Sequence, residues 1–349
     1  MAKGNALHDW HAEVLAIRAF NRFLLDELLL VLTPPHPPSQ YLRQTTPEEQ
    51  TSSEPQPFAL RDDIRIHMYC SEAPCGDASM ELTMSLQADA TPWTSPVPTV
   101  SSPPLPTPQD PEISSLTALR GRSHFSHLGL VRCKPSRPDA PPTLSKSCTD
   151  KLALRQATSL LAGLTSLLIS PRNAYLQTLV LPASQHVPSA CERAFSSSGR
   201  MASTAEKASA CWDGGYMWRP FTVLSTSREF AWSRRMVPKE MKAMSSNLSA
   251  VWTPGWQETL IGGVLQGRKQ FDPRGASRIC RRGVWEVAMR VATVVGVPAL
   301  VQMLGKQTYA NVKEGEMLEA RRRVKGDVKR EGLNGWVENR GDDEFSLEA

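Results

Sequence analysis

The first strong pattern along the chain is a run of apolar residues with helical spacing. Apolar side chains recur about every 3.6 residues between positions 11 and 32, which predicts one helix with a buried face. Asp9, just ahead of the run, has the short polar side chain of an N-cap, and Thr33-Pro34-Pro35 ends the pattern. The apolar face comprises Val14, Leu15, Phe20, Phe23, Leu24, Leu28 and Leu29.

Shorter runs have the composition of strands. Residues 64–68 alternate apolar and polar side chains and lead into Ala73-Pro74-Cys75-Gly76, which has the residues of a turn. Thr253-Pro254-Gly255 separates two later runs and predicts a hairpin. The remaining strand candidates are 175–181, 221–226, 248–252 and 258–261.

Further helices are predicted between these strands and near the C-terminus. Leu152 to Ile169 has helical periodicity. Ser147 and Asp150, just before this segment, have the spacing of a capping pair. Residues 191–195, 277–295 and 309–330 also favour helices. The last of these carries a crowd of basic side chains, for which a solvated surface is the ordinary interpretation. They are Arg321, Arg322, Arg323, Lys325, Lys329 and Arg330.

Two stretches interrupt these patterns and contain few residues that could enter a core. Residues 33–57 are rich in Pro, Gln, Ser, Thr and Glu, and residues 86–115 are rich in Pro, Ser and Thr. Such composition is typical of disordered segments. We therefore expect one domain, 1–349, with two disordered inserts.

Composition excludes several classes of protein. A chain of 349 residues with 40% apolar content can build a real core, and a net charge of +5 is compatible with a polyanionic partner without establishing one. Seven scattered cysteines, an odd number, predict reduced thiols in an intracellular compartment. The longest apolar runs are shorter than the roughly 18 residues of a membrane span. A soluble intracellular protein is expected.

Three residues whose side chains can bind zinc stand at the starts of predicted helices. His11 begins the first helix, Cys75 lies in the turn before a helix-compatible stretch, and Cys148 opens the segment that follows Ser147. One imidazole and two thiolates leave a fourth position for water, and Glu13, two residues after His11, is a candidate for proton transfer. The set predicts a catalytic metal site.

Other interpretations of these residues remain open from spacing alone. A His and a Glu at a helix start can also have a purely structural role, in which they cap the helix and interact with its dipole. The compact Pro-Cys-x-x-Cys signature of zinc deaminases is absent, Cys70 is expected to be a buried strand thiol, and His124-x-x-His127 is a competing ligand pair in a basic loop.

Read together, these segments resemble the ADAR and tRNA-specific adenosine deaminase family, whose two cysteines are also widely separated. The tRNA branch, and its fungal members in particular, is the most similar. The stretches that carry the resemblance are 4–14 (GNALHDWHAEV), 74–78 (PCGDA), 120–122 (RGR), 134–143 (KPSRPDAPPT), 147–154 (SCTDKLAL), 277–280 (SRIC), 309–313 (YANVK) and 332–338 (GLNGWVE).

The resemblance implies a fold and an activity. The fold is the cytidine-deaminase-like α/β class, with a three-layer α/β/α core, a mixed sheet and extra C-terminal helices. The activity is hydrolytic deamination of adenosine to inosine in tRNA, 3′ of the anticodon in tRNA-Ala. Zn²⁺ on His11, Cys75 and Cys148 and proton transfer by Glu13 carry the chemistry.

The resemblance also implies two sets of binding residues. A basic region of the chain is expected to contact the phosphates of the anticodon loop. Its members are Arg120, Arg122, Lys134 and Arg137. Family members also enclose an inositol hexakisphosphate, and the matching positions here are Arg18, Lys151, Arg281, Tyr309, Lys313 and Trp336. Leu154 and Ile17 stand where relatives place arginines.

Two departures from the family pattern bear on function. Trp10 sits beside the histidine ligand, where the family usually has a small residue, and the strands that precede the His-x-Glu helix in relatives have no counterpart here. A truncated N-terminus is therefore expected, which leaves a non-catalytic RNA-binding or scaffold relative as the alternative function. A free-nucleoside deaminase is disfavoured by the length and the wide cysteine spacing.

Overall fold

The computed structural model describes residues 2–35, 38–89, 91, 95–101, 117–122, 124–134, 141–242, 244, 246–339 and 341–347. The helices are α1 (Ala12–Leu32), α2 (Met80–Ser85), α3 (Cys148–Thr158), α4 (Thr165–Leu168), α5 (Pro188–Phe195), α6 (Ala202–Cys211), α7 (Arg281–Val295), α8 (Pro298–Leu304), α9 (Tyr309–Lys313) and α10 (Glu319–Glu331). No helix within the described ranges is both long enough and apolar enough to cross a membrane.

The strands fall into four small sheets. They are β1 (Leu42–Gln44), β2 (Phe58–Leu60), β3 (Ile66–Tyr69), β4 (Thr99–Ser101), β5 (Thr117–Arg120), β6 (Arg132–Cys133), β7 (Leu176–Pro182), β8 (Thr222–Thr226), β9 (Leu248–Thr253), β10 (Trp256–Ile261) and β11 (Val264–Leu265). The sheet orders are β1-β2, β3-β7-β8, β4-β5-β6 and β11-β10-β9. Only the β4-β5-β6 sheet mixes parallel and antiparallel pairs among these strands.

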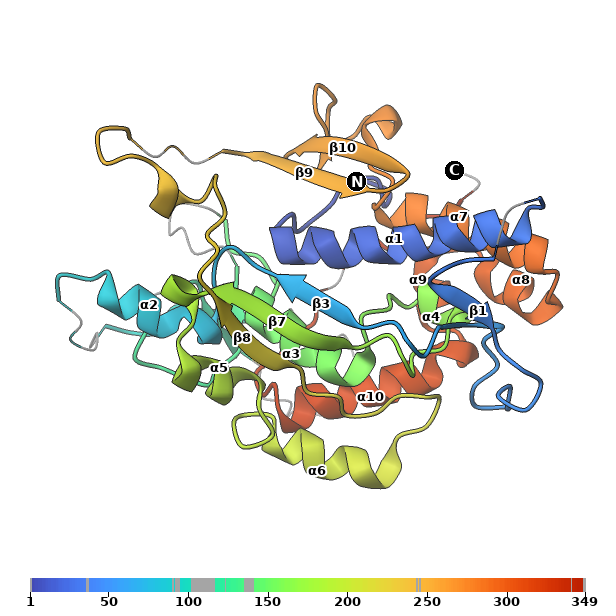
Figure 1. Cartoon of the computed structure of the whole chain (residues 1–349), viewed down its shortest axis with the longest axis horizontal. Helices are drawn as coiled ribbons and strands as arrows, with labels where there is room; N and C mark the ends of the chain where they lie inside the picture. Colours follow the sequence, from blue (N-terminus) through green and yellow to red (C-terminus); the bar gives the residue numbers. More distant parts are fainter. Residues whose placement is uncertain are drawn as a thin grey trace, which may run out of the picture.

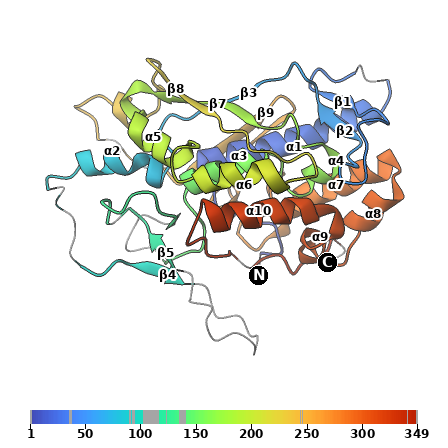
Figure 2. The same cartoon turned by 90° about the horizontal axis from the view of Figure 1, so that it is seen from below.

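The sheet that positions the site is β3-β7-β8, whose described strands all run parallel. Met68, Leu179 and Val223 lie in one row across it and pack into the core beneath α1 and α3. Figure 2 shows the three strands along one border of the molecule, with α1, α3 and α10 on the inner side. The expected α/β class with additional C-terminal helices is confirmed.

The opposite face of this sheet differs from the expected three-layer arrangement. Tyr69 and Leu224 belong to the next row, and they are 45% and 50% exposed. No described helix therefore buries these two side chains. In the described chain, helices cover one face of the sheet and leave this one open.

A second core packs against α1 from its other side. The buried face of α1 packs with α4, α7 and α8 around Trp285, which is 1% exposed. The β9-β10 hairpin lies across α1, as Figure 1 shows, and Trp256 of this hairpin donates a hydrogen bond to Asp26 (3.0 Å). The N-terminal segment is attached to the same sheet, because the Leu7 amide donates to the Gly263 carbonyl (2.8 Å). Gly263 has φ +86°, and a Cβ atom at this position would lie 2.2 Å from the carbonyl oxygen of Leu7.

Several sequence predictions need correction. Residues 42–44, inside the expected disordered insert 33–57, form β1 and pair with β2 because Leu42 enters the core. Within 86–115, residues 99–101 form β4, and 102–115 lie outside the described residues. Asp9 is not the N-cap of α1. His11 is, and Asp9 accepts a hydrogen bond from the His11 amide (3.2 Å).

Two predicted helices are broken. The segment 152–169 divides into α3 and α4 at Ser159, whose φ of +56° is incompatible with a continuing helix. The segment 309–330 divides at 314–318, where Gly315 packs against Met303. In both cases the apolar periodicity continues across the break, so the pattern alone does not reveal it. The other predicted helices and strands are present within a few residues of the expected bounds.

The buried face of α1 provides a test of the fold. Leu24 is fully buried and Leu30, on the same helix, is 49% exposed. We expect Leu24→Ala to lower the free energy of unfolding by about 2–5 kcal/mol through lost burial and a cavity. Leu30→Ala should change it by less than about 0.5 kcal/mol. Chemical denaturation of both variants measures the difference, and equal effects would contradict the packing of α1.

Candidate metal centre and active site

The three predicted ligands meet at one point although 137 positions separate the first from the last. His11 Nδ1 lies 3.7 Å from Cys75 Sγ and 3.5 Å from Cys148 Sγ, and all three atoms are within 4.8 Å of one another. A tetrahedral zinc ion with bonds of about 2.3 Å to sulfur and 2.0–2.1 Å to nitrogen separates such ligands by about 3.5–3.7 Å. The donor set and its spacing therefore fit zinc.

The two cysteine-bearing turns are held together by direct contacts. The Cys148 amide donates to Cys75 Sγ (3.3 Å), and the Thr149 amide donates to the Cys75 carbonyl (3.0 Å). Gly76 has φ +109°, and a Cβ on it would lie 2.2 Å from Ser147 Oγ. Glycine is thus required twice at this position, by the backbone angle and by the close approach of the next ligand's N-cap.

Buried ion pairs support each cysteine turn from α5 and the turn after it. Asp77, two residues after Cys75, is fully buried and pairs with Arg193 (3.1 Å). Asp150, two residues after Cys148, is also fully buried and pairs with Arg200 (2.7 Å). Buried pairs of this kind strongly destabilise a protein when one partner is removed. Neither arginine was identified from the sequence, where nothing marks them as partners of residues more than 40 positions away.

A chain of charges leads from the metal ligands into the interior. Lys134 Nζ donates to Cys148 Sγ (3.4 Å) and to both carboxylate oxygens of Asp9 (2.9 and 2.8 Å). Lys151 pairs with the same carboxylate and donates to Ser145 Oγ (2.9 Å). Burial alone would raise the pKa of Asp9, but the ammonium groups of Lys151 and Lys134 hold that pKa well below its usual range. Asp9 is therefore a permanent anion between two cations.

The titrating groups at the ligands suit metal binding. Contact with Cys148 lowers the pKa of Cys75, while contact with Cys75 and burial raise the pKa of Cys148. The hydrogen bond to Cys75 raises the pKa of His11. Divalent metals displace protons from such sites, so metal binding and proton release are linked. Burial raises the pKa of Glu13, and the charges of Cys75, His11 and Lys134 also act on it. A carboxyl group at this position can cycle between its two forms.

The competing candidates do not join this cluster. His127 is exposed and His124 is buried, and the backbone carbonyls of both accept hydrogen bonds from the Arg132 guanidinium (2.7 and 3.0 Å). Among the described residues, His11, Cys75 and Cys148 form the one group of possible ligands that lie close together. Cys70 is a buried thiol on the hydrogen-bonded end of β3, and burial raises its pKa.

The predicted RNA-contacting residues separate into different environments. Arg122 is exposed and Arg120 is half-buried at the end of β5. Lys134 is directed toward Asp9 and Cys148, so its charge belongs to the metal site instead of to an open phosphate-binding surface. Arg137 lies outside the described residues.

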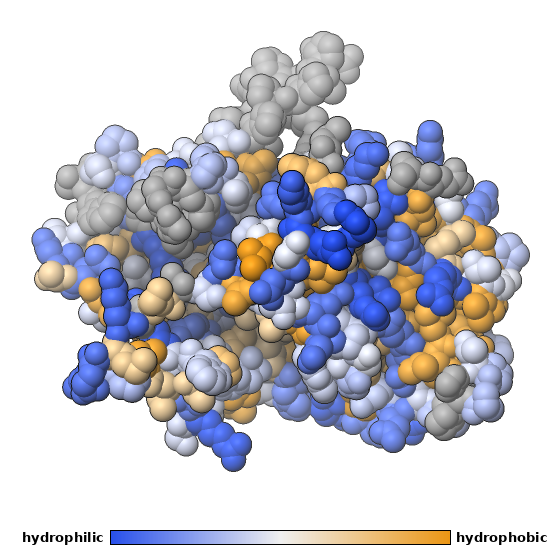
Figure 3. All heavy atoms as spheres, turned by 90° about the horizontal axis from the view of Figure 1, so that it is seen from above, coloured by the Kyte–Doolittle hydropathy of each residue, from blue (hydrophilic) through white to orange (hydrophobic). Residues whose placement is uncertain are grey.

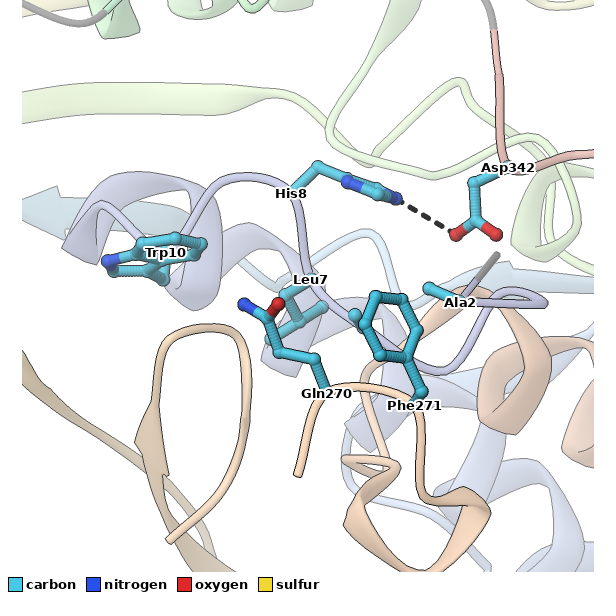
Figure 4. Close-up of a pocket in the computed structure, with 8 residues that line it drawn as sticks. Ala2, Leu7, His8, Trp10, Gln270, Phe271 and Asp342 are labelled. Carbon is cyan, nitrogen blue, oxygen red and sulfur yellow. Dashed lines mark hydrogen bonds and ion pairs between the residues drawn. The ribbon is translucent and has the colours of Figure 1, made fainter. Parts of the chain in front are cut away.

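Trp10, the bulky neighbour of the histidine ligand, finds room by turning outward. Its side chain lines a pocket of about 450 Å³ together with Gln270 and Phe271, as Figure 4 shows. On the other side of this pocket His8 Nε2 pairs with Asp342 (2.9 Å), which also accepts from the Gly4 amide (3.0 Å). The C-terminal segment thus fixes the chain that leads to His11, a contact that the sequence pattern did not indicate.

A second concentration of charge lies among side chains of α1, α3 and α10. Burial, and then the nearby cations Arg321 and Arg18, lower the pKa of Arg155 to about 9. Burial, and then Lys329, lower the pKa of Lys325 to about 7. Burial also lowers the pKa of Arg18. Arg155, Lys325 and Arg18 keep part of their surface accessible, and we call these three residues and their cationic neighbours the cationic core.

The six positions predicted for a polyphosphate contribute to this cationic core in different ways. Arg18 donates to the Ile279 carbonyl (2.8 Å), and Lys151 holds Asp9. Arg281 lies over the ring of Tyr309, and Lys313 pairs with Asp343 (3.0 Å). The ammonium nitrogens of Lys146 and Lys329 lie over the ring of Trp336, 5.3 and 5.5 Å from its centroid. Leu154 and Ile17 are buried and apolar.

The strongest members of the cationic core were missed from the sequence. Arg155 follows Lys151 by four residues on α3, and Arg321, Lys325 and Lys329 repeat at the same spacing on α10. The interpretation of this basic run as a solvated surface is wrong for that face, because Arg321 donates to the Thr158 and Leu161 carbonyls (2.7 and 2.6 Å). A four-residue repeat of cations beside buried Val324 and Val328 was the available signal.

Comparison with known proteins agrees with this geometry. The model of the adenosine-deaminase (editase) domain matches residues 1–340. The chain is 35% identical over 344 residues to tRNA-specific adenosine deaminase 1 of Schizosaccharomyces pombe. The aligned residues make up 97% of this chain and 78% of that protein. It is 33% identical over 182 residues to tRNA-specific adenosine deaminase 1 of Saccharomyces cerevisiae, an alignment that covers 52% of this chain and 41% of that protein. It is 34% identical over 92 residues to double-stranded RNA-specific editase B2 of Rattus norvegicus, with 25% of this chain and 11% of that protein covered.

The contact between the cysteine turns predicts a specific loss of metal. Gly76→Ala should lower the zinc content of the purified protein severalfold, because the added methyl group pushes Ser147 and Cys148 away from Cys75. Gly129→Ala is the matched control, since Gly129 also has a positive φ (+75°) but open space around its Cβ position. Metal analysis of both variants decides the matter. Full zinc in Gly76→Ala would contradict the role of this contact.

Proposed function

The chain belongs to the adenosine-deaminase (editase) domain family, and from that premise we propose that it deaminates adenosine to inosine in tRNA by zinc-dependent hydrolysis. The observation that carries the proposal is the convergence of His11, Cys75 and Cys148 at zinc spacing, with Glu13 in the first turn of α1. Three protein ligands leave one coordination position for the reacting water, as catalytic zinc sites require.

The residues around the metal have separable tasks. When bound, zinc supplies the Lewis acidity that activates water for attack on C6 of adenine. Glu13, the carboxyl group two residues from His11, would accept one proton of that water and deliver it to the ring nitrogen N1; it would then take the proton of the hydroxyl group added at C6 and deliver it to the amino group, which leaves as ammonia. Lys134 stabilises the thiolate of Cys148 by donating to Cys148 Sγ, and Asp9 holds Lys134 in place.

We propose the anticodon loop of tRNA-Ala as the substrate, with the target adenosine 3′ of the anticodon. The names of the two fungal relatives support tRNA as the substrate class. A single-stranded loop lets a base turn out of the stack into a pocket with little loss of stacking energy. Arg120, Arg122 and Arg137 are proposed to contact the phosphates around that base.

We further propose that the cationic core binds inositol hexakisphosphate. A group of cations that lower one another's pKa values is unfavourable unless an anion neutralises them, and a polyphosphate does so with several charge-assisted hydrogen bonds. Lys151 belongs to both regions, since it holds Asp9 and opens the helix that carries Arg155. A bound polyphosphate would therefore stabilise the chain of charges that ends at Cys148.

The catalytic assignment predicts a clean separation of metal binding from turnover. Glu13→Gln should keep one zinc per chain, because Glu13 is not a ligand, and should lower the rate of inosine formation on a tRNA-Ala transcript at least about a hundredfold. Metal analysis and sequencing of the reacted tRNA measure the two quantities. Cys148→Ser should lose both.

The outcome for the unmutated protein separates the competing functions. Inosine at the proposed position supports the enzyme. Full zinc and tRNA binding without inosine would favour a scaffold relative, and activity retained in Glu13→Gln would refute the role of the carboxyl group.

The cationic core predicts opposite effects of one substitution with and without ligand. The pKa of Lys325 is depressed in the folded protein, so the buried ammonium group destabilises the fold at neutral pH. This destabilisation decreases as the pH rises toward 10.5, the ordinary pKa of the lysine side chain. Without polyphosphate, Lys325→Met should therefore raise the Tm. Added inositol hexakisphosphate should raise the Tm of the unmutated protein more than that of Lys325→Met.

Arg323 on the same helix serves as the control, because it is exposed and pairs with Asp213 (3.3 Å). Arg323→Met should leave the response to inositol hexakisphosphate unchanged. Thermal melts across pH, with and without the ligand, provide the comparison. An identical ligand response in Lys325→Met and the unmutated protein would contradict the proposed site.

A further inference from the structure

The segment that follows β8, residues 227–242, is fastened to the loop that carries Cys75. Arg235 donates to the Ser71 carbonyl (2.6 Å) and to both carboxylate oxygens of Glu72 (2.8 Å each), three residues before Cys75. Tyr69 donates to the Arg228 carbonyl (3.3 Å) from the end of β3. We name residues 227–242 the β8 arm. The β8 arm is therefore attached to the loop that leads to Cys75.

A second anchor joins the β8 arm to the end of β7. Ser184, in the turn after β7, donates to the carboxylate of Glu229, which also accepts from Arg235 (2.9 Å). The loops after β3, β7 and β8 therefore interlock at the carboxyl edge of the parallel sheet. Ligands of open α/β sheets bind outside this edge. Figure 1 shows the arm on the side of the molecule where α1 begins.

Large apolar side chains project into solvent from this anchored segment. Trp232 is 86% exposed, and Phe230, Met236 and Met241 are also exposed. Ser233, between them, is buried, so the backbone is packed while the aromatic rings are not. An exposed tryptophan held on a fastened loop needs little ordering when a flat partner stacks on it.

The charges interleaved with these rings favour an anionic partner. Residues 227–242 contain five basic and two acidic side chains. Arg228, Arg234, Lys239 and Lys242 are exposed and form no ion pair with any described residue. Figure 3 shows hydrophobic and strongly hydrophilic surface intermixed on the side where Figure 1 places the arm. Aromatic rings between free cations are the pattern of single-stranded nucleic acid binding.

We propose that the β8 arm is a stacking platform for an unpaired nucleotide of the anticodon loop that neighbours the target adenosine. Trp232 stacks on the base, Phe230 extends the apolar surface, and Arg228 and Arg234 contact the adjoining phosphates. The proposal rests on the proposed tRNA substrate and adds a positioning role to it. Because the arm is tied to the Cys75 loop, a base held there fixes the distance of its neighbour from the metal.

The test measures RNA binding apart from turnover. The full-length zinc-loaded protein carries Glu13→Ala so that substrate is not consumed, and fluorescence anisotropy gives the Kd for the tRNA-Ala anticodon stem-loop. Base–aromatic stacking contributes about 1–3 kcal/mol, so Trp232→Ala should raise the Kd by about fivefold or more. Trp232→Phe should restore most of the affinity. The double variant Arg228→Gln, Arg234→Gln should weaken binding and reduce its dependence on salt concentration.

Trp252→Ala is the matched control, because Trp252 is also a largely exposed tryptophan (70%) and lies near the far end of β9. It should leave the Kd unchanged. In the active protein, Trp232→Ala should lower kcat/KM on tRNA while the zinc content stays at one per chain.

The results separate this proposal from the proposed function. Normal RNA binding and normal inosine formation in Trp232→Ala would overturn the platform and leave the deaminase assignment intact. A protein that binds no anticodon stem-loop would overturn both. If Trp232→Ala instead converts a dimer to a monomer in light scattering, with the Kd unchanged, the arm is a contact between copies of the chain and the proposal is wrong.

Discussion

The close approach of Gly76 to Ser147 is the contact on which the candidate active site depends. It brings together two turns that are 71 positions apart, and the Cys148 amide then reaches Cys75 Sγ. His11 completes the group from the start of α1, whose position is set by two hydrophobic cores. Buried Asp77 and Asp150 hold the two turns against α5 and the turn that follows it. The site is thus a product of long-range packing, with little local structure of its own.

Charge connects this site with the interior. Lys134 and Lys151 share the carboxylate of Asp9, and the helix that begins at Cys148 carries Lys151 and Arg155 on successive turns. One end of α3 therefore supplies a metal ligand, and its next two turns lead into the cationic core. Loss of neutralising anion in that core would act on the Cys148 thiolate through these lysines. This single helix would couple the two proposed ligands, zinc and a polyphosphate.

The sequence predicted the residues that meet at the candidate site better than it predicted the packing. His11, Glu13, Cys75 and Cys148 were identifiable because their residue types are rare together and each stands at a helix start. The break at Ser159 and the strand at 42–44 were missed because tertiary contacts decide them against weak local preferences. The inward face of α10 was misread because charged side chains are usually solvated, and no local feature shows that Lys325 has cations for neighbours. Arg193 and Arg200 could not be found, since their partners are distant in sequence.

We propose that one imidazole nitrogen and two thiolates hold one zinc ion at the meeting point of α1, the turn after β3 and α3. X-ray absorption at the zinc edge of the purified protein reports the ligands of that ion. We expect two sulfur ligands at about 2.3 Å and nitrogen or oxygen ligands at about 2.0–2.1 Å. A shell of four sulfurs, or one without sulfur, would contradict it.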